Sequence, residues 1–151
     1  MLVDSFQERD GWTDKSPYQK WQDKEGIPSY TGNFVDDVMA LELGDWKRLG
    51  GKGAYLNLSA QEETDGYVVE IPPKQSLNIE HHLFEGIIYI LKGKGATSVW
   101  QTNGPKQTFE WQEGSLFAVP LNAWHQHFNG SATESVRYSP HEMRRIILSR
   151  P

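Results

Sequence analysis

The sequence contains no cysteine among its 151 residues. Disulfide bonds, thiolate metal ligands and cysteine nucleophiles are therefore excluded together. No apolar run approaches the roughly 18 residues of a membrane-spanning helix. The N-terminal segment MLVDSFQERDGW is acidic and lacks the apolar stretch of a secretory signal. We expect a cytoplasmic protein with no membrane partner.

Positive charge is also scarce in this chain. It has 15 Lys and Arg residues against 20 Asp and Glu residues, which gives a formal net charge of −5. A nucleic-acid surface needs clustered Lys and Arg to neutralise phosphates, and the pair Arg144-Arg145 near the C-terminus does not make one. We therefore expect no nucleic-acid partner.

The residues that are present favour a β-rich domain from Leu49 onward. The chain has the length of one domain, and six each of Trp, Tyr and Phe supply core material. Short β-prone runs alternate with Gly, Pro, Asn and Asp at about 8–12 residue spacing, as in an antiparallel sandwich or barrel. The sequence TNGP, at Thr102–Pro105, predicts the turn of a β-hairpin. The other runs are GAYLNLS, GYVVEIPP, EHHLFEGIIYILKGKG, GATSVWQ, KQTFEWQEG, SLFAVP, HQHFNG and ESVRYSP.

The N-terminal third differs in composition from the rest of the chain. Residues 1–35 are polar with scattered aromatics, which is typical of an extended arm. From Val35, the sequence VDDVMALELGDW has an approximate apolar face that stops at Gly44, so we expect a short helix there. The predicted organisation is an arm over residues 1–48, lying on the barrel or on a partner subunit, followed by the barrel over residues 49–151.

GSLFAVPLNAWHQHFN resembles the second of the two motifs of the cupin superfamily, whose members are small jelly-roll barrels. Gly114 opens the motif, Pro120 follows, and Asn122 stands where the family has a second Gly. Asn tolerates the left-handed conformation that a tight turn requires. The resemblance makes His125 the family's metal ligand and Asn129 the closing residue.

The first cupin motif is recognisable but altered. Gly93 closes it, and Lys74 takes the position of the opening Gly. Glu80 replaces the first histidine ligand, His82 matches the second, and Gly86 falls where the family has a glutamate. The resemblance to the cupin motifs covers residues 66–138. The sequence is also similar to the N-terminal half of uncharacterised two-cupin proteins. The resemblance implies an all-β cupin-type double-stranded β-helix, either as a natural single cupin or as a shortened two-cupin protein.

Strand alternation separates the polar residues around His82. Residues of equal parity share one face of a strand, so Glu80 and His82 point into the barrel together, with Phe84 and Gly86. His81 and Glu85 then point outward, and the doubled histidine is not a chelate on an unbroken strand. A β-bulge near Leu83 or Glu85 would turn Glu85 inward, and Gly86 is the kind of residue that marks one.

The inward polar set therefore predicts a metal site made of His82, His125, Glu80 and His127. Two imidazoles and one carboxylate with open positions are typical of non-haem iron oxygenases, and Fe, Mn, Ni, Co and Zn all bind such donors. His127, which shares a face with His125, would make a more closed site. Each residue has an alternative role: Glu80 as a hydrogen-bond partner of a histidine, and the imidazoles as satisfied interior groups.

Two functions follow from this resemblance. The first is a metal-dependent cupin acting on a small organic substrate, as a dioxygenase or as a Lewis-acid isomerase or hydrolase. The second is a metal-free or non-catalytic cupin that serves as a ligand-binding or oligomerisation module, which the Glu80 and Gly86 replacements favour. The family's dimers suggest a homodimer formed by arm exchange or strand pairing.

Overall fold

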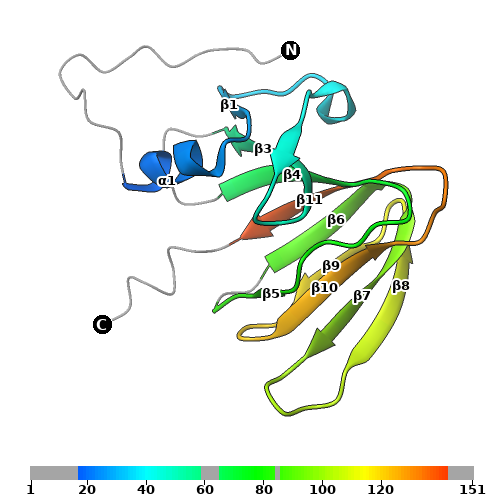
Figure 1. Ribbon diagram of the computed structural model, residues 1–151. Helices are drawn as coiled ribbons and strands as arrows, with labels where there is room; N and C mark the ends of the chain where they lie inside the picture. The colour runs from blue at the N-terminus through cyan, green and yellow to red at the C-terminus, as the bar shows by residue number, and fades with distance from the viewer. Residues whose placement is uncertain (1–16, 59–64, 84–85, 143–151) are drawn as a thin grey trace.

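Two β-sheets make up most of the protein (Figure 1). The computed structural model describes residues 17–58, 65–83 and 86–142. The larger sheet has the order β1-β3-β4-β11-β6-β9, with β2 also paired to β3, and the smaller has the order β5-β10-β7-β8. The strands are β1 (Ser29–Thr31), β2 (Gly44–Trp46), β3 (Gly51–Asn57), β4 (Asp65–Ile71), β5 (Glu80–His81), β6 (Gly86–Lys92), β7 (Lys94–Trp100), β8 (Gln107–Gln112), β9 (Leu116–Val119), β10 (Trp124–Asn129) and β11 (Val136–Glu142).

The inner faces of the two sheets form one core, as expected for an all-β jelly roll. Strand alternation sends one set of side chains inward, and Ile90, Val69 and Tyr138 from the larger sheet are all buried. Within the described residues, the buried polar side chains are Gln22, Thr97, His125 and His127. Three of these four lie on the smaller sheet, so its inner face carries the polar interior of the barrel.

Three non-glycine residues of the described chain lie in the left-handed region, and one of them, Asn103 with φ 62°, is in the turn between β7 and β8. Asn122, between β9 and β10, has φ 58°, and Lys74, after β4, has φ 60°. At Asn122 and Lys74 the cupin motifs have Gly, a residue that takes this conformation without steric cost. The structure therefore confirms the turn geometry expected at Asn122 and gives the physical reason for the family's Gly at both positions.

The helix lies in a different place from the one the sequence suggested. Helix α1 (Pro17–Glu25) occupies part of the stretch expected to be extended, whereas the segment after Val35 forms only a 3-10 turn, η1 (Val38–Ala40). The short apolar face of that segment was the wrong signal, because Asp37 caps a single turn and the backbone is already extended at Leu41, before β2 begins at Gly44. No helix in the described ranges is long and apolar enough to cross a membrane.

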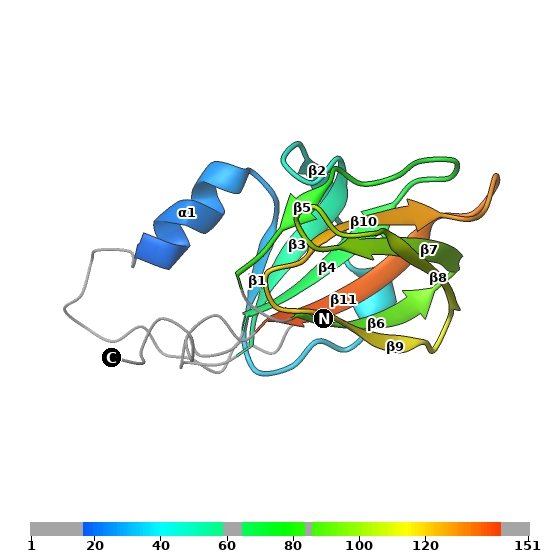
Figure 2. The same cartoon turned by 90° about the horizontal axis from the view of Figure 1, so that it is seen from below.

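The N-terminal elements are attached to the barrel through β3. β1 pairs with β3 in parallel and β2 pairs with it antiparallel, so residues from the expected arm extend the larger sheet. Gln22 of α1 is buried and exchanges two hydrogen bonds of 3.1 Å with Asn57 of β3. Figures 1 and 2 show α1 beside β1 and β3 at one side of the barrel.

Arg137 on β11 fastens the η1 turn to the larger sheet. Its Nη1 donates to the backbone carbonyls of Val38, Met39 and Leu41, and its Nη2 lies 3.1 Å from the Glu70 carboxylate. The Arg137 side chain is only 11% exposed. A guanidinium can satisfy several carbonyls and a carboxylate at once because its five N–H groups have a fixed geometry.

We expect Arg137→Met to lower the free energy of unfolding by about 3 kcal/mol, because it takes the cationic partner from Glu70 and the hydrogen-bond donor from three carbonyls. Urea unfolding followed by circular dichroism measures this change. The matched control is Lys52→Met, since Lys52 Nζ is 4.0 Å from Asp45 and both side chains are exposed. The control should change stability by less than about 0.5 kcal/mol. Equal effects of the two substitutions would contradict the role given to Arg137.

Candidate metal centre

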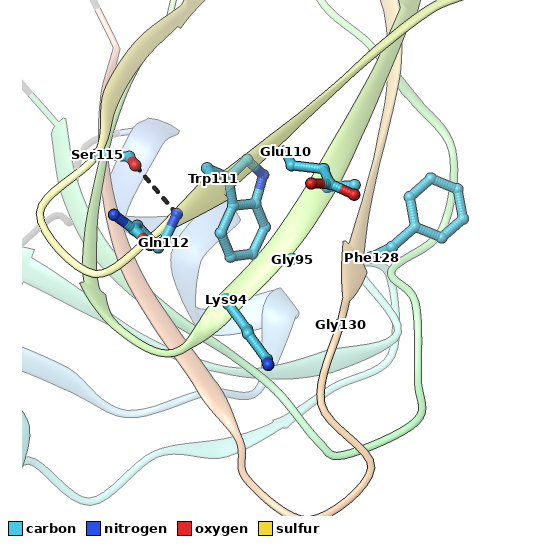
Figure 3. A pocket seen from close by; sticks show the side chains of 9 residues that line it. Lys94, Gly95, Glu110, Trp111, Gln112, Ser115, Phe128 and Gly130 are labelled. Atoms are coloured by element: carbon cyan, nitrogen blue, oxygen red, sulfur yellow. Dashed lines mark hydrogen bonds between the residues drawn. The ribbon is translucent and has the colours of Figure 1, made fainter.

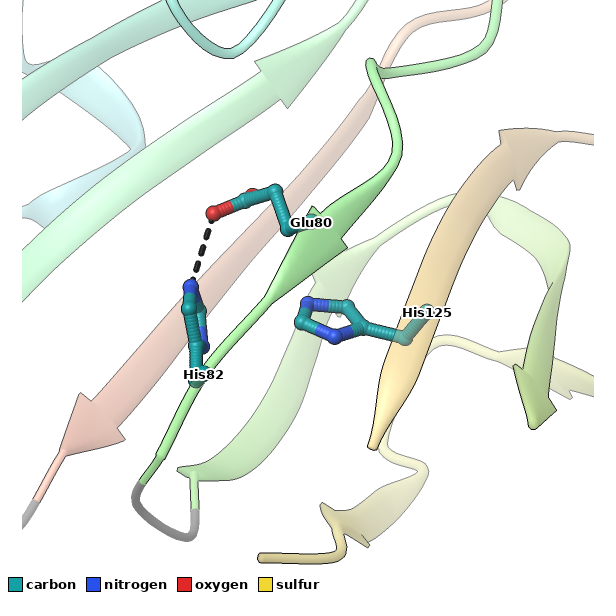
Figure 4. A group of neighbouring side chains, drawn as sticks. All are labelled: Glu80, His82 and His125. Carbon is teal, nitrogen blue, oxygen red and sulfur yellow. Dashed lines mark hydrogen bonds and ion pairs between the residues drawn. The ribbon is translucent and has the colours of Figure 1, made fainter. Parts of the chain in front are cut away.

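The pairing of β5 with β10 brings three side chains that can bind a metal together at one edge of the smaller sheet. Glu80 is the direct cross-strand partner of His125, and His81 is the partner of Trp124. Directly opposed residues on antiparallel strands have neighbouring side chains on the same face. His82 follows immediately after β5, and Figure 4 shows its ring directed toward the Glu80 carboxylate, while the ring of His125 extends from β10.

The three side chains form a compact group. His82 Nε2 is 2.8 Å from Glu80 Oε2, and the rings of His82 and His125 have centroids 4.9 Å apart. The carboxylate oxygen and the two imidazole nitrogens lie within 4.8 Å of one another. His125 is buried, whereas Glu80 and His82 are half-buried.

The electrostatic surroundings keep Glu80 ionised. Burial alone would raise the pKa of its carboxyl. The hydrogen bond and charge of His82 act in the opposite direction, as do the charges of His125 and Arg48, and they hold this pKa below its ordinary value. Glu80 is therefore an anion at neutral pH, which is the form that binds a cation.

This donor set fits a divalent cation. Donors bound to one ion at about 2.1 Å are at most about 4.2 Å apart, so small side-chain rotations would bring all three to one centre. Two imidazoles and a carboxylate suit Fe, Mn, Ni, Co or Zn, and the chemistry of the donors does not select among them.

His127 lies deeper in the barrel than this group. Its ring centroid is 5.2 Å from that of His125, and it is not among the three residues whose donors converge. Its Nδ1 is 2.7 Å from Thr97 Oγ1, which accepts a hydrogen bond of 2.8 Å from Trp111 Nε1. A hydroxyl that accepts from Trp111 can donate its own proton to His127. Burial lowers the pKa of His127 to about 3, with a further contribution from the charge of His125.

The remaining residues around His82 are divided between the interior and the exterior. His81 is exposed, stacks on Trp124 with centroids 4.6 Å apart, and lies 2.8 Å from Asn122 Oδ1. Gly86 is buried and lines the same cavity as His82 and His125, so a carboxylate at that position would face the site. Glu85 and Phe84 lie outside the described residues.

The cavity at the site is small. Its volume is about 10 Å³, which is about the room that one water molecule or ion needs. Its lining combines the polar group with apolar and aromatic walls, namely Tyr67, Glu80, His82, Gly86, Ile88, Val119, His125, His127, Tyr138 and Pro140. The cavity is large enough for an ion, and an organic molecule needs additional space at its rim.

A larger hollow of about 540 Å³ lies elsewhere, at the ends of β7, β8 and β10 (Figure 3). Its charged lining residues are Lys94 and Glu110, and both are exposed. Buried convergent polar groups distinguish a binding site from a surface hollow, and this one has none among its lining residues. Size alone therefore does not identify the functional site in this protein.

Sequence reasoning missed three residues that support the site. Arg48 contacts Glu80, and Thr97 and Trp111 hold His127 in place. Strand alternation could have placed Thr97 on an inner face, but its register against Trp111 and His127 depends on three-strand pairing. Nothing in the sequence around Arg48 signals a contact with a residue 32 positions away.

The fold and the polar interior together define a cupin-type jelly roll. No protein-family model matches the sequence, and no curated protein matches it either. Solved structures do match: the Schizosaccharomyces pombe Cnp3 cupin domain superposes with a TM-score of 0.58 and 23% identity over 74% of each chain. The chain therefore has the cupin fold expected from its two motifs.

Oxalate decarboxylases are also similar in structure. The formate complex of the Lactobacillus farciminis enzyme matches with a TM-score of 0.59 and 20% identity over 68% of this chain. The Bacillus subtilis enzyme matches with a TM-score of 0.60 and 19% identity over 70% of this chain. This chain spans only 31% and 28% of those two proteins, and the likeness concerns the fold alone.

The low pKa of His127 gives stability a measurable pH dependence. Its folded-state pKa of about 3 lies below the ordinary value of 6.5, so the folded state binds fewer protons between these values. Stability is therefore complete above about pH 6.5 and falls as the pH decreases, by up to about 1.4 kcal/mol per pH unit from this residue. We expect His127→Gln to reduce that slope in urea unfolding between pH 7 and pH 4. Glu80 is present in both the unaltered chain and the variant, so it does not contribute to the difference between their slopes. Identical slopes would contradict the burial of a neutral His127.

Proposed function

We propose that this protein is a divalent-metal-dependent cupin that acts on a small organic substrate, with Glu80, His82 and His125 as its metal ligands. The observation that carries the proposal is the convergence of one carboxylate and two imidazoles within 4.8 Å at the wall of a buried cavity. Polar side chains at this density inside a barrel are costly unless they are paired or bind an ion.

The three ligands would leave positions on the ion for a small molecule. A bound ion would supply Lewis-acid or oxygen-activating chemistry. The chain's own residues would fix the donors, exclude water through the apolar cavity wall, and offer at His127 a neutral imidazole that can hold a proton. Because the cavity admits an ion but not an organic molecule, substrate entry requires side chains at its rim to move.

Two classes of reaction suit such a metal centre. A dioxygenase follows from the resemblance of the donor set to non-haem iron centres, and a Lewis-acid isomerase or hydrolase follows from the same open positions. The similar Bacillus subtilis oxalate decarboxylase contains Mn(II) centres, which makes manganese a suitable first ion to test. This support is an analogy between folds.

A metal-free cupin is the second candidate, and one observation favours it. Two members of the polar group are already paired without an ion, because His82 is hydrogen-bonded to Glu80 at 2.8 Å and Arg48 lies 3.5 Å from the same oxygen. Gly86 also removes the carboxylate that the family motif supplies. In that case the barrel would serve as a ligand-binding or oligomerisation module.

Elemental analysis of protein purified without added metal separates the two candidates. We expect a nearly stoichiometric transition metal, and we expect a chelator to lower the melting temperature because an ion that binds only the folded state stabilises it. His125→Ala should remove the metal. His141→Ala is the matched control, since His141 is exposed on β11, is not part of the convergent group, and its loss should leave the metal bound. Metal-free protein whose stability is unaffected by chelator and by added Mn, Fe or Zn would favour the second candidate.

We also propose that the chain forms a homodimer by strand pairing at β9, the last strand in the order of the larger sheet. An edge strand presents unpaired backbone groups to a second copy. Leu116 on β9 is 66% exposed, and its cross-strand partner Tyr89 is 43% exposed. Sedimentation velocity should detect a dimer that Leu116→Lys dissociates and that Leu58→Lys, on another exposed apolar residue, leaves intact. A monomer at all concentrations would contradict this.

A further inference from the structure

Arg48 connects the N-terminal helix to the candidate metal centre. It lies in the turn between β2 and β3, and its guanidinium carbon is 5.5 Å from the ring centroid of Trp21 and 5.1 Å from that of Trp46. Cation–π contacts of this kind fix the direction of a guanidinium. Arg48 therefore has a defined orientation although 41% of its side chain is exposed.

The charges along this connection alternate in sign. Arg48 Nε is 2.8 Å from Glu25 Oε2 at the end of α1, and its Nη1 is 3.5 Å from Glu80 Oε2. Trp46 Nε1 also donates to Glu25 Oε2. Glu25 is thus held from two sides, and it holds Arg48 in turn against the carboxylate of the metal group.

We propose that Arg48, fixed by Glu25, is a positioning residue that holds the Glu80 carboxylate at the metal centre. This inference rests on the proposed function. If His82 and Glu80 both bind one ion, the hydrogen bond between them is lost, and His82 no longer orients the Glu80 carboxylate. Arg48 is the other charged contact of Glu80 in the described residues, and it remains in place. Partners that orient a ligating carboxylate contribute strongly to metal affinity.

The positive charge of Arg48 does not work against this role. An isolated guanidinium beside a ligand would repel a divalent cation. Here Glu25 lies closer to Arg48 than Glu80 does, at 2.8 Å against 3.5 Å, so the pair Glu25–Arg48 carries little net charge. Removing Glu25 alone should therefore weaken metal binding for two reasons. It frees Arg48 to move, and it leaves the positive charge of Arg48 uncompensated.

Mn(II) titration of the full chain, followed by the electron paramagnetic resonance signal of the free ion, tests the proposal. We expect Arg48→Met to weaken Mn(II) binding about tenfold, because methionine keeps an apolar stem between Trp21 and Trp46 but cannot hold Glu80. Arg48→Lys should restore part of the affinity, since a lysine keeps the charge without the planar fork. The spectrum of the bound ion should change in Arg48→Met as well, which a loss of stability alone would not cause.

A double-mutant cycle tests the role of Glu25. Glu25→Gln should weaken Mn(II) binding in the unaltered chain and have no further effect in the Arg48→Met background. Lys52→Met is the matched control, because it removes one positive charge at an exposed pair with Asp45 and should change affinity by less than about twofold. Circular dichroism of each metal-free variant establishes that it is folded.

The outcomes separate this inference from the proposed function. If the unaltered chain binds Mn(II) and Arg48→Met binds it equally or more tightly, the positioning role is wrong and the metal centre stands. If Glu25→Gln and Arg48→Met act additively, Glu25 does not work through Arg48. If the unaltered chain binds no Mn(II), Fe(II) or Zn(II), both the metal centre and the positioning role are wrong.

Discussion

The antiparallel pairing of β5 with β10 is the contact on which the candidate site depends. Only two residue pairs form it, Glu80 with His125 and His81 with Trp124. This register places the carboxylate opposite the buried imidazole and turns His81 away to stack on Trp124. A shift of one residue would exchange the inner and outer faces of β5 and bring His81 inward in place of both Glu80 and His82. The stack of His81 on Trp124 thus helps to fix the register from outside the barrel.

The sequence predicted the barrel well because its signals are local. Short β-prone runs, the turn residue Asn122, and the alternation of Glu80 and His82 each depend on neighbours in the chain. Helix α1 was missed because it is polar along most of its length, and its place depends on Gln22 reaching Asn57 of β3. The contact of Arg48 with Glu80 was missed for the same reason, since tertiary packing alone creates it.

The number of convergent donors is the central chemical question for this protein. Gly86 leaves the cavity without the family's glutamate, while Glu80 supplies a carboxylate from the position of a family histidine. Relative to the cupin motif that the sequence resembles, the carboxylate of this group stands on β5 instead of β6, beside two imidazoles. His127 remains a neutral neighbour held by Thr97 rather than a member of the convergent group. The same geometry also explains how the group could remain stable without an ion, through the contacts of Glu80 with His82 and Arg48.

Anomalous X-ray scattering from crystals grown with Mn(II) is the measurement that tests the metal centre most directly. The account predicts one strong anomalous peak inside the barrel, in contact with Glu80, His82 and His125, and a retained contact between Arg48 and Glu80. A barrel interior without a peak at saturating Mn(II), with Glu80 still hydrogen-bonded to His82, would contradict it.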